Sequence, residues 1–373
     1  MRGMDTNEPA AGMRAVGTMT GEEPTAGERT DVPSIDEVTA TSEPAAGSVC
    51  AAGSSAVESA GGGAAPVEPA SGSQGGTPPS HSRRQEVTGV VATLVGGSCW
   101  GISGTMASML FDGYGVGTMW LLSVRQICAG LMFMVFDLIF CRQRLVKLWT
   151  TREHRRTLLV FAFCGLLPNQ LFYLVAVRYT NAGTATVLQY LQLLFVLAYN
   201  CIKDRRAPTA REGAGVVLAI AGTFLIATGG DPTSLSISPA GLAAGIVCAL
   251  ATAGVSIIPA KILPEYGSPV VTGSAMFTSG LVTSAIMRPW SDVPDFDVQG
   301  WVALAIFVVL GSFMAYLLYL EGVKDIGGMR ASLLGTMEPV VATVSSAVLL
   351  GTVFTATDLV GFALIIVMMF FTV

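Results

Sequence analysis

Ten long apolar stretches fill the chain from residue 88 to residue 373, and they constrain its fold more than any other feature. Each stretch is close to the about 20 residues that an α-helix needs to cross a bilayer. Because the stretches are continuous and do not alternate with polar residues, they predict helices and not a β-barrel. The predicted spans are 88–110, 118–140, 157–177, 184–202, 213–229, 240–259, 270–287, 300–320, 331–350 and 357–373.

Composition separates a polar tail from this membrane part. Residues 1–85 are rich in Ala, Gly, Ser, Thr, Glu and Pro and contain no aromatic residue, which predicts a disordered tail. Only 13% of the whole chain is charged, against about 25% in a typical soluble protein, so most of the surface does not face water. The expected parts are the tail (1–85), five spans in 86–229 and five spans in 230–373.

Lysine and arginine residues predict the orientation. Fifteen of them lie in the tail end and loops on one side of the predicted spans, whereas the loops on the other side hold only Arg178 and Arg288. Cytoplasmic loops carry the excess of basic residues. We therefore expect a multi-pass protein of the cell membrane with both termini, and the tail, in the cytoplasm.

The two halves of the membrane part resemble each other. A shift of 146 residues places Tyr173 on Tyr319, and Ala185 falls on Ala331. Each half has five spans, an odd number, so the second half enters the membrane inverted relative to the first. Inverted repeats are typical of secondary transporters, in which the substrate site lies near the midplane where the halves meet.

Short motifs in both halves are typical of one protein family. The last repeat contains Tyr319-Leu320-Glu321-Gly322-Val323-Lys324, Ala331-Ser332-Leu333-Leu334 and Glu338-Pro339-Val340-Val341-Ala342. The first repeat contains Trp100-Gly101, Arg125 and the stretch from Arg178 to Gly183. In their order and spacing these motifs resemble those of EamA-domain proteins of the drug/metabolite transporter superfamily. The resemblance implies ten transmembrane helices arranged as two inverted five-helix repeats around a central cavity, an all-α integral membrane fold. It also implies export of amino acids, related metabolites or toxic compounds.

Two positions depart from the family pattern. Leu193 stands where the family often has a proline, so span 4 is expected to be straighter than span 9, which has Pro339. Thr352 follows Gly351 where the family commonly has a glutamate.

Charged residues inside spans are the first candidates for function, because such groups are costly at membrane depth. Glu338 lies well inside span 9, beside Pro339, and is the candidate carrier of a coupling proton; a structural hydrogen-bonding role is the alternative. Arg125 enters span 2 from the opposite side, either to hold substrate or to bind helix carbonyls. Asp137 and Glu321 are expected to reach headgroup water near the ends of their spans.

Polar and aromatic side chains near the midplane complete the candidate site. Substrate binding is predicted for these residues, with interhelical hydrogen bonding or simple packing as the alternative. A break of span 3 at Pro168 would add backbone carbonyls to the same space. The candidates are Gln189, Tyr190, Gln192, Asn169, Gln170, Trp100, Tyr173 and Tyr319.

These observations favour a secondary transporter that exports amino acids or similar small polar metabolites, with proton coupling through Glu338. The alternatives are an uptake or exchange carrier for other metabolites or toxic compounds, and a membrane scaffold that transports nothing. The sequence has no Walker A motif and no cluster of catalytic or metal-ligating residues, so we expect no enzyme, cofactor or metal site. The expected partners are a small-molecule substrate and the lipid bilayer, and no nucleic acid.

Overall fold

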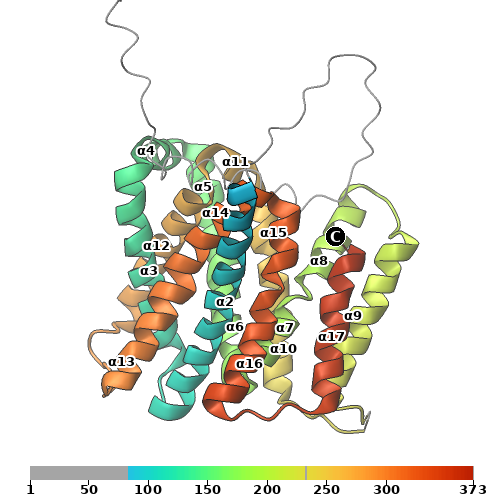
Figure 1. The fold of residues 1–373 in the computed structure, drawn as a ribbon. Helices are drawn as coiled ribbons and strands as arrows, with labels where there is room; N and C mark the ends of the chain where they lie inside the picture. The colour runs from blue at the N-terminus through green and yellow to red at the C-terminus, as the bar shows by residue number, and fades with distance from the viewer. Residues whose placement is uncertain (1–82, 232, 373) are drawn as a thin grey trace, which may run out of the picture. The chain divides into compact units, whose positions relative to one another are not determined.

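A computed structural model of the protein describes residues 83–231 and 233–372, and in this part the chain is helical without strands (Figure 1). The predicted disordered tail lies outside the described residues, apart from residues 83–85, which form the first turn of a helix. Nine helical segments in the described part are long and apolar enough to span a membrane, and a shorter apolar helix follows them. The ten predicted spans are therefore confirmed.

Single helices form five of the ten spans, and the other five are divided into segments. The single helices are α2 (Arg83–Tyr114), α3 (Thr118–Phe140), α9 (Ala210–Thr228), α12 (Ser268–Met287) and α17 (Ala356–Thr372). The divided spans are α5 (Arg152–Val160), η2 (Phe161–Leu166) and α6 (Leu167–Tyr179); α7 (Ala182–Gln189) and α8 (Gln192–Lys203); α10 (Pro239–Ile257) and η3 (Ile258–Lys261); α13 (Val298–Ala305), η4 (Ile306–Met314) and α14 (Ala315–Ile326); α15 (Gly328–Gly335) and α16 (Met337–Leu350).

Spans 3 and 8 each contain a wide, π-helical segment, η2 and η4. In span 3 this segment directly precedes Pro168, whose ring cannot donate a backbone hydrogen bond and would crowd the preceding turn of an α-helix. The predicted break at Pro168 is thus a local widening of a helix that continues. In η4 the displaced carbonyls accept side-chain bonds: Ser103 Oγ donates to Phe307 O at 3.3 Å.

Spans 4 and 9 are each interrupted halfway. The break in span 9 falls at Thr336, and the break in span 4 falls at Tyr190 and Leu191. The expectation of a straighter span 4 is wrong, because that helix is interrupted although Leu193 replaces the proline. Its break is made by short i to i+3 bonds, from Tyr190 N to Val187 O and from Leu191 N to Leu188 O.

Helix pairs repeat between the two halves of the bundle. α2 packs along α14 and α10 packs along α6, while α3 packs along α12 and α9 along α17 (Figure 1). A shift of 146 residues relates the α2–α14 pair to the α10–α6 pair. The same shift relates α3 to α12 and α9 to α17, so in these two pairs each helix packs against its own counterpart. A two-fold relation between inverted halves requires this pattern, and the predicted fold class of two inverted repeats is confirmed.

α3 and α12 cross at a glycine. A Cβ atom added to Gly130 would lie 2.5 Å from the backbone nitrogen of Phe277 and 2.6 Å from its Cα, closer than real Cβ atoms approach. Small residues at such crossings allow two helix backbones to pack closely inside a membrane. The contact joins Gly130 to the neighbourhood of Met276, its counterpart under the 146-residue shift.

Three short helices lie at one end of the bundle (Figure 1). They are α4 (Arg142–Thr150), which precedes span 3, α5, which begins span 3, and α11 (Leu263–Tyr266), which follows span 6. We call this end of the bundle the basic end. Lys147 Nζ on α4 lies 2.7 Å from Glu265 Oε1 on α11, and His154 Nδ1 lies 2.7 Å from Tyr266 Oη. The hydrogen bond from Lys147 holds the pKa of the Glu265 carboxyl below its usual range.

The Lys147–Glu265 pair gives a testable pH dependence. A carboxyl whose pKa is lowered by folding stabilises the folded protein above its unfolded pKa, and this contribution is lost as the pH falls through the folded pKa. Glu265→Gln should therefore lower the Tm by about 1–2 °C at about pH 7, because exposed pairs contribute little. At about pH 3 the difference in Tm should be smaller than at about pH 7, because the carboxyl of the native protein takes up its proton as the pH falls. Glu153→Gln on α5 is the control, and an equal Tm loss at both pH values would contradict the assignment.

Candidate functional site

A cavity of about 330 Å³ lies among helices of both halves. Its walls come from α2, α3, α6, the interrupted spans 4 and 9, α10, α14 and α17. The two halves thus enclose it together, as expected for a central cavity between inverted repeats.

All ten residues that the sequence singled out line this one cavity. They are Trp100, Arg125, Asn169, Gln170, Tyr173, Gln189, Tyr190, Gln192, Tyr319 and Glu338. Their convergence is a finding about placement, and their role in binding stays a prediction.

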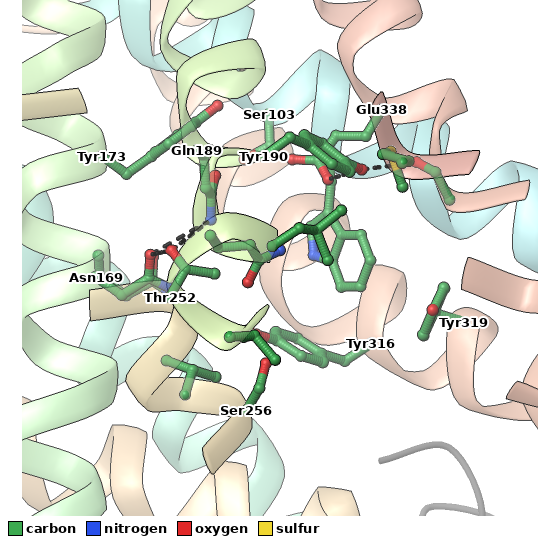
Figure 2. Close-up of a pocket in the computed structure, with 18 of the residues that line it drawn as sticks. Ser103, Asn169, Tyr173, Gln189, Tyr190, Thr252, Ser256, Tyr316, Tyr319 and Glu338 are labelled. Atoms are coloured by element: carbon green, nitrogen blue, oxygen red, sulfur yellow. Dashed lines mark hydrogen bonds between the residues drawn. The ribbon is translucent and has the colours of Figure 1, made fainter. Parts of the chain in front are cut away.

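Aromatic rings form one wall of the cavity. The ring of Trp100 on α2 lies 5.1 Å from that of Tyr316, edge to face, and 5.2 Å from that of Tyr319, with both tyrosines on α14. Figure 2 shows the two tyrosine side chains below and beside Glu338. Electron-rich ring faces of this kind attract cations such as an ammonium group.

The two helix interruptions meet beside the acidic residue. Tyr190, at the break of span 4, donates from Oη to Gly335 O at 3.1 Å, next to the break of span 9 (Figure 2). The same hydroxyl lies 3.5 Å from Glu338 Oε2, a long hydrogen bond. Glu338 lies in the first turn of α16, where the helix dipole favours a negative charge.

A hydrogen-bonded cluster occupies the opposite wall, where α6, α7 and α10 meet. Asn169 Oδ1 accepts from Thr252 Oγ1 at 2.7 Å and from Gln189 Nε2 at 3.3 Å (Figure 2). Tyr173 Oη is 3.0 Å from Thr186 Oγ1. These hydrogen bonds agree with the interhelical role weighed from the sequence, and the choice between that role and substrate binding stays a prediction for Asn169, Gln189 and Tyr173.

Arg125 is anchored to the π-helical segment η4. Its Nε donates to Ser312 Oγ at 2.8 Å, its Nη2 donates to Gly311 O at 3.3 Å, and its guanidinium lies 4.7 Å from the centre of the Phe307 ring. The residue is buried, with 6% of its surface exposed. Its Nη1 donates to no side chain or carbonyl in the described part of the chain. One face of the guanidinium is therefore fixed by the protein, and donors remain for a bound anion.

Gln192 and Gln170 keep free hydrogen-bonding capacity. Neither side chain has a hydrogen-bond partner among residues 83–231 and 233–372, although Gln170 is buried. Under the 146-residue shift Gln192 is the counterpart of Glu338, so an amide and an acid occupy equivalent places. The pair gives the cavity one titratable group and one neutral group.

Several lining residues were not predicted. They are Ser103, Leu193, Val196, Thr252, Val255, Ser256, Tyr316, Gly335 and Met369. The repeat could have identified Tyr316, because the 146-residue shift places it on Gln170. The spacing of Thr252 and Ser256 was also a usable signal, because two hydroxyls four residues apart lie on one face of span 6.

Two other acidic residues were expected to reach headgroup water, and Asp137 does not. Asp137 is fully buried, because α4 turns back after span 2 and covers this end of α3 with Leu145 and Leu148. Glu321 is half-buried and accepts a bond at 2.9 Å from Lys324. Neither lines the cavity.

Comparison with known proteins places the chain among membrane transporters. The model of the EamA-like transporter family matches residues 87–228 and again 240–373. An uncharacterized inner membrane transporter of Salmonella typhimurium LT2, YicL, is 33% identical over 280 residues, which are 74% of this chain and 92% of the relative. The uncharacterized transporter YyaM of Bacillus subtilis 168 is 24% identical over 228 residues, 58% of this chain and 73% of the relative.

A solved crystal structure has a similar fold. It superposes with a TM-score of 0.52 at 17% identity and covers 74% of this chain and 94% of the other. At that identity the likeness concerns the fold alone.

Proposed function

This chain belongs to the EamA-like transporter family, and we propose that it exports amino acids or similar small polar metabolites in exchange for protons. Membership makes it a multi-pass membrane transporter of small molecules and points away from an enzyme. The observation that carries the finer proposal is the cavity between the halves, where one acid, one arginine and several aromatic rings converge.

The size and lining of the cavity favour a small polar solute. Its volume of about 330 Å³ is at the lower end of the range for small-molecule sites, about 300–1,000 Å³. A zwitterion would find an acceptor for its ammonium group in Glu338, beside the rings of Trp100 and Tyr319. Its carboxylate would find the unused donors of Arg125.

Glu338 is proposed to bind the substrate's ammonium group and the proton in turn. The ionised carboxylate holds the cation, and a proton arriving from outside takes its place and releases the substrate. The next cycle begins when that proton leaves toward the cytoplasm. Competition for one carboxylate couples the two flows without a second site.

Orientation and direction belong to the same proposal. The basic end, with α4, α5 and α11, faces the cytoplasm because basic residues concentrate in cytoplasmic loops. Both termini then lie in the cytoplasm of a cell whose plasma membrane the protein spans. An inward proton gradient would drive substrate out.

Counterflow in proteoliposomes tests the function. Vesicles preloaded with each member of an amino-acid panel should take up the labelled compound in a saturable way, and a pH gradient should drive its accumulation against its own gradient. Flux that does not saturate would indicate a channel. Absence of flux for every compound would favour the scaffold.

Arg125 provides a test of carboxylate recognition. Arg125→Gln should reduce the preference for an amino acid over its decarboxylated amine by about 10- to 100-fold, the value of one charge-assisted hydrogen bond. The measurement is the ratio of kcat/KM for the two compounds. Because the amine lacks the carboxylate, its own transport should change little.

Arg178→Gln is the matched control. Arg178 also donates to a backbone carbonyl, Val116 O at 3.1 Å, and lies over the Phe111 ring, but it does not line the cavity. Its loss should leave the ratio unchanged. An equal change of the ratio in both variants would assign Arg125 to structure alone.

A further inference from the structure

A second carboxylate lies outside the cavity, at the other side of α3. Asp137 has no exposed surface, and neither of its carboxylate oxygens has a hydrogen-bond partner in the described part of the chain. It is not among the residues that line the cavity. The transport proposal therefore does not use it.

Apolar groups and a glycine surround this side chain. A Cβ atom added to Gly273 on α12 would lie 2.5 Å from Phe133 Cβ and 3.2 Å from Asp137 Oδ2, so Phe133 fills the notch that Gly273 leaves and the carboxyl lies at its edge. Phe133 belongs to a fully buried cluster with Leu148 and Tyr266. Helix α3 is thus packed on α12 with the acid between them.

No charged group neutralises Asp137 from the neighbouring elements. Helix α12 and segment η4 contain no charged residue. Helix α4 contributes Lys147, which pairs with Glu265 of α11. It also contributes Arg142 and Arg144, and neither forms a salt bridge with Asp137. The charged Arg178 of α6 binds Val116 O instead.

An acid in this position fits the packed helix pair only in its neutral form. An ionised carboxylate without a partner is far more costly in an apolar site than an unsatisfied neutral group. The ionised form needs water, and water reaches this position when α3 and α12 separate. Proton binding and helix packing at the basic end are therefore thermodynamically linked.

We propose that Asp137 is a proton-binding site distinct from the cavity: it holds a proton while α3 and α12 are packed and releases it to water when the pair opens at the basic end. The site goes beyond the transport proposal and does not depend on Glu338. Its ligand is the proton alone, and the carboxyl needs no partner from another chain.

Hydrogen–deuterium exchange of the purified full chain in nanodiscs tests the link between pH and packing. After correction for intrinsic exchange, backbone amides of 133–145 and 268–277 should exchange about 10-fold faster at about pH 8.5 than at about pH 6. In Asp137→Asn, which cannot ionise, the same amides should show no pH response. Asp292→Asn, in an exposed loop, should behave like the native chain.

Two results would overturn the proposal. One is a native chain whose exchange in these segments does not depend on pH, and the other is an Asp137→Asn variant with the native response. Infrared spectroscopy gives a second measurement if Asp137→Asn does not fold. A protonated-carboxyl band should persist in Glu338→Gln and disappear when Asp137→Leu is added to that variant. Absence of the band from Glu338→Gln at about pH 6 would also refute the site.

Discussion

Proton-driven accumulation of substrate by Glu338→Gln should fall to the level of vesicles without protein. Glutamine has the size of glutamate and can still accept the bond from Tyr190 Oη, but it cannot take up a proton. Exchange of preloaded substrate should continue at a raised KM, because the amide carbonyl still accepts a hydrogen bond from an ammonium group. The measurement is uptake with and without a pH gradient in the same vesicles.

Glu321→Gln is the control for this change. Glu321 is a half-buried glutamate on α14 that pairs with Lys324 and does not line the cavity. Its variant should accumulate substrate as the native protein does. If Glu338→Gln kept the native proton-driven accumulation, the carboxylate would not be the coupling group.

Gly130→Ala should lower the Tm by about 3–10 °C, because overpacking a tight helix crossing costs about 1–3 kcal/mol. The added Cβ would meet the backbone of Phe277 at 2.5–2.6 Å, and the backbone of one helix cannot rotate away as a flexible side chain would. The two helices must move apart along their whole contact. Thermal unfolding followed by size-exclusion chromatography measures the effect.

Gly213→Ala makes the same substitution at an open position of α9, on a side of the helix that meets no neighbour. A Cβ added to Gly213 meets no atom within 4 Å. The change should leave the Tm unchanged or raise it slightly, because alanine loses less backbone entropy on folding than glycine does. Similar Tm losses in both variants would show that the close crossing does not set the stability.

The sequence predicted the ten spans and their division into halves because both depend on patterns along the chain. The length of each apolar run follows from the thickness of the bilayer. The repeat can be recognised from matching residues in two segments that lie 146 positions apart. The domain limits at 85 and 229 stay predictions. The interruption at Tyr190 and Leu191 left no such signal, since neither glycine nor proline marks it.

The candidate residues were predicted from their cost at membrane depth, and the structure gathers them around one cavity. Depth along a span says nothing about which way a side chain faces, which is why Asp137 was expected in headgroup water and is buried instead. Thr252 and Tyr316 were missed for a related reason. A hydroxyl or a single aromatic ring costs little free energy inside a membrane span, so its presence alone does not indicate a functional site.

The two π-helical segments occupy equivalent places in the two spans that contain them. An α-helix that gains one residue without losing its ends must accommodate the extra residue as a wider turn. η2 (Phe161–Leu166), shifted by 146 residues, falls inside η4 (Ile306–Met314). The two wide turns therefore follow the same inverted-repeat relation as the helix pairs. Pro168 alone does not explain them, because Met314 occupies its place in span 8.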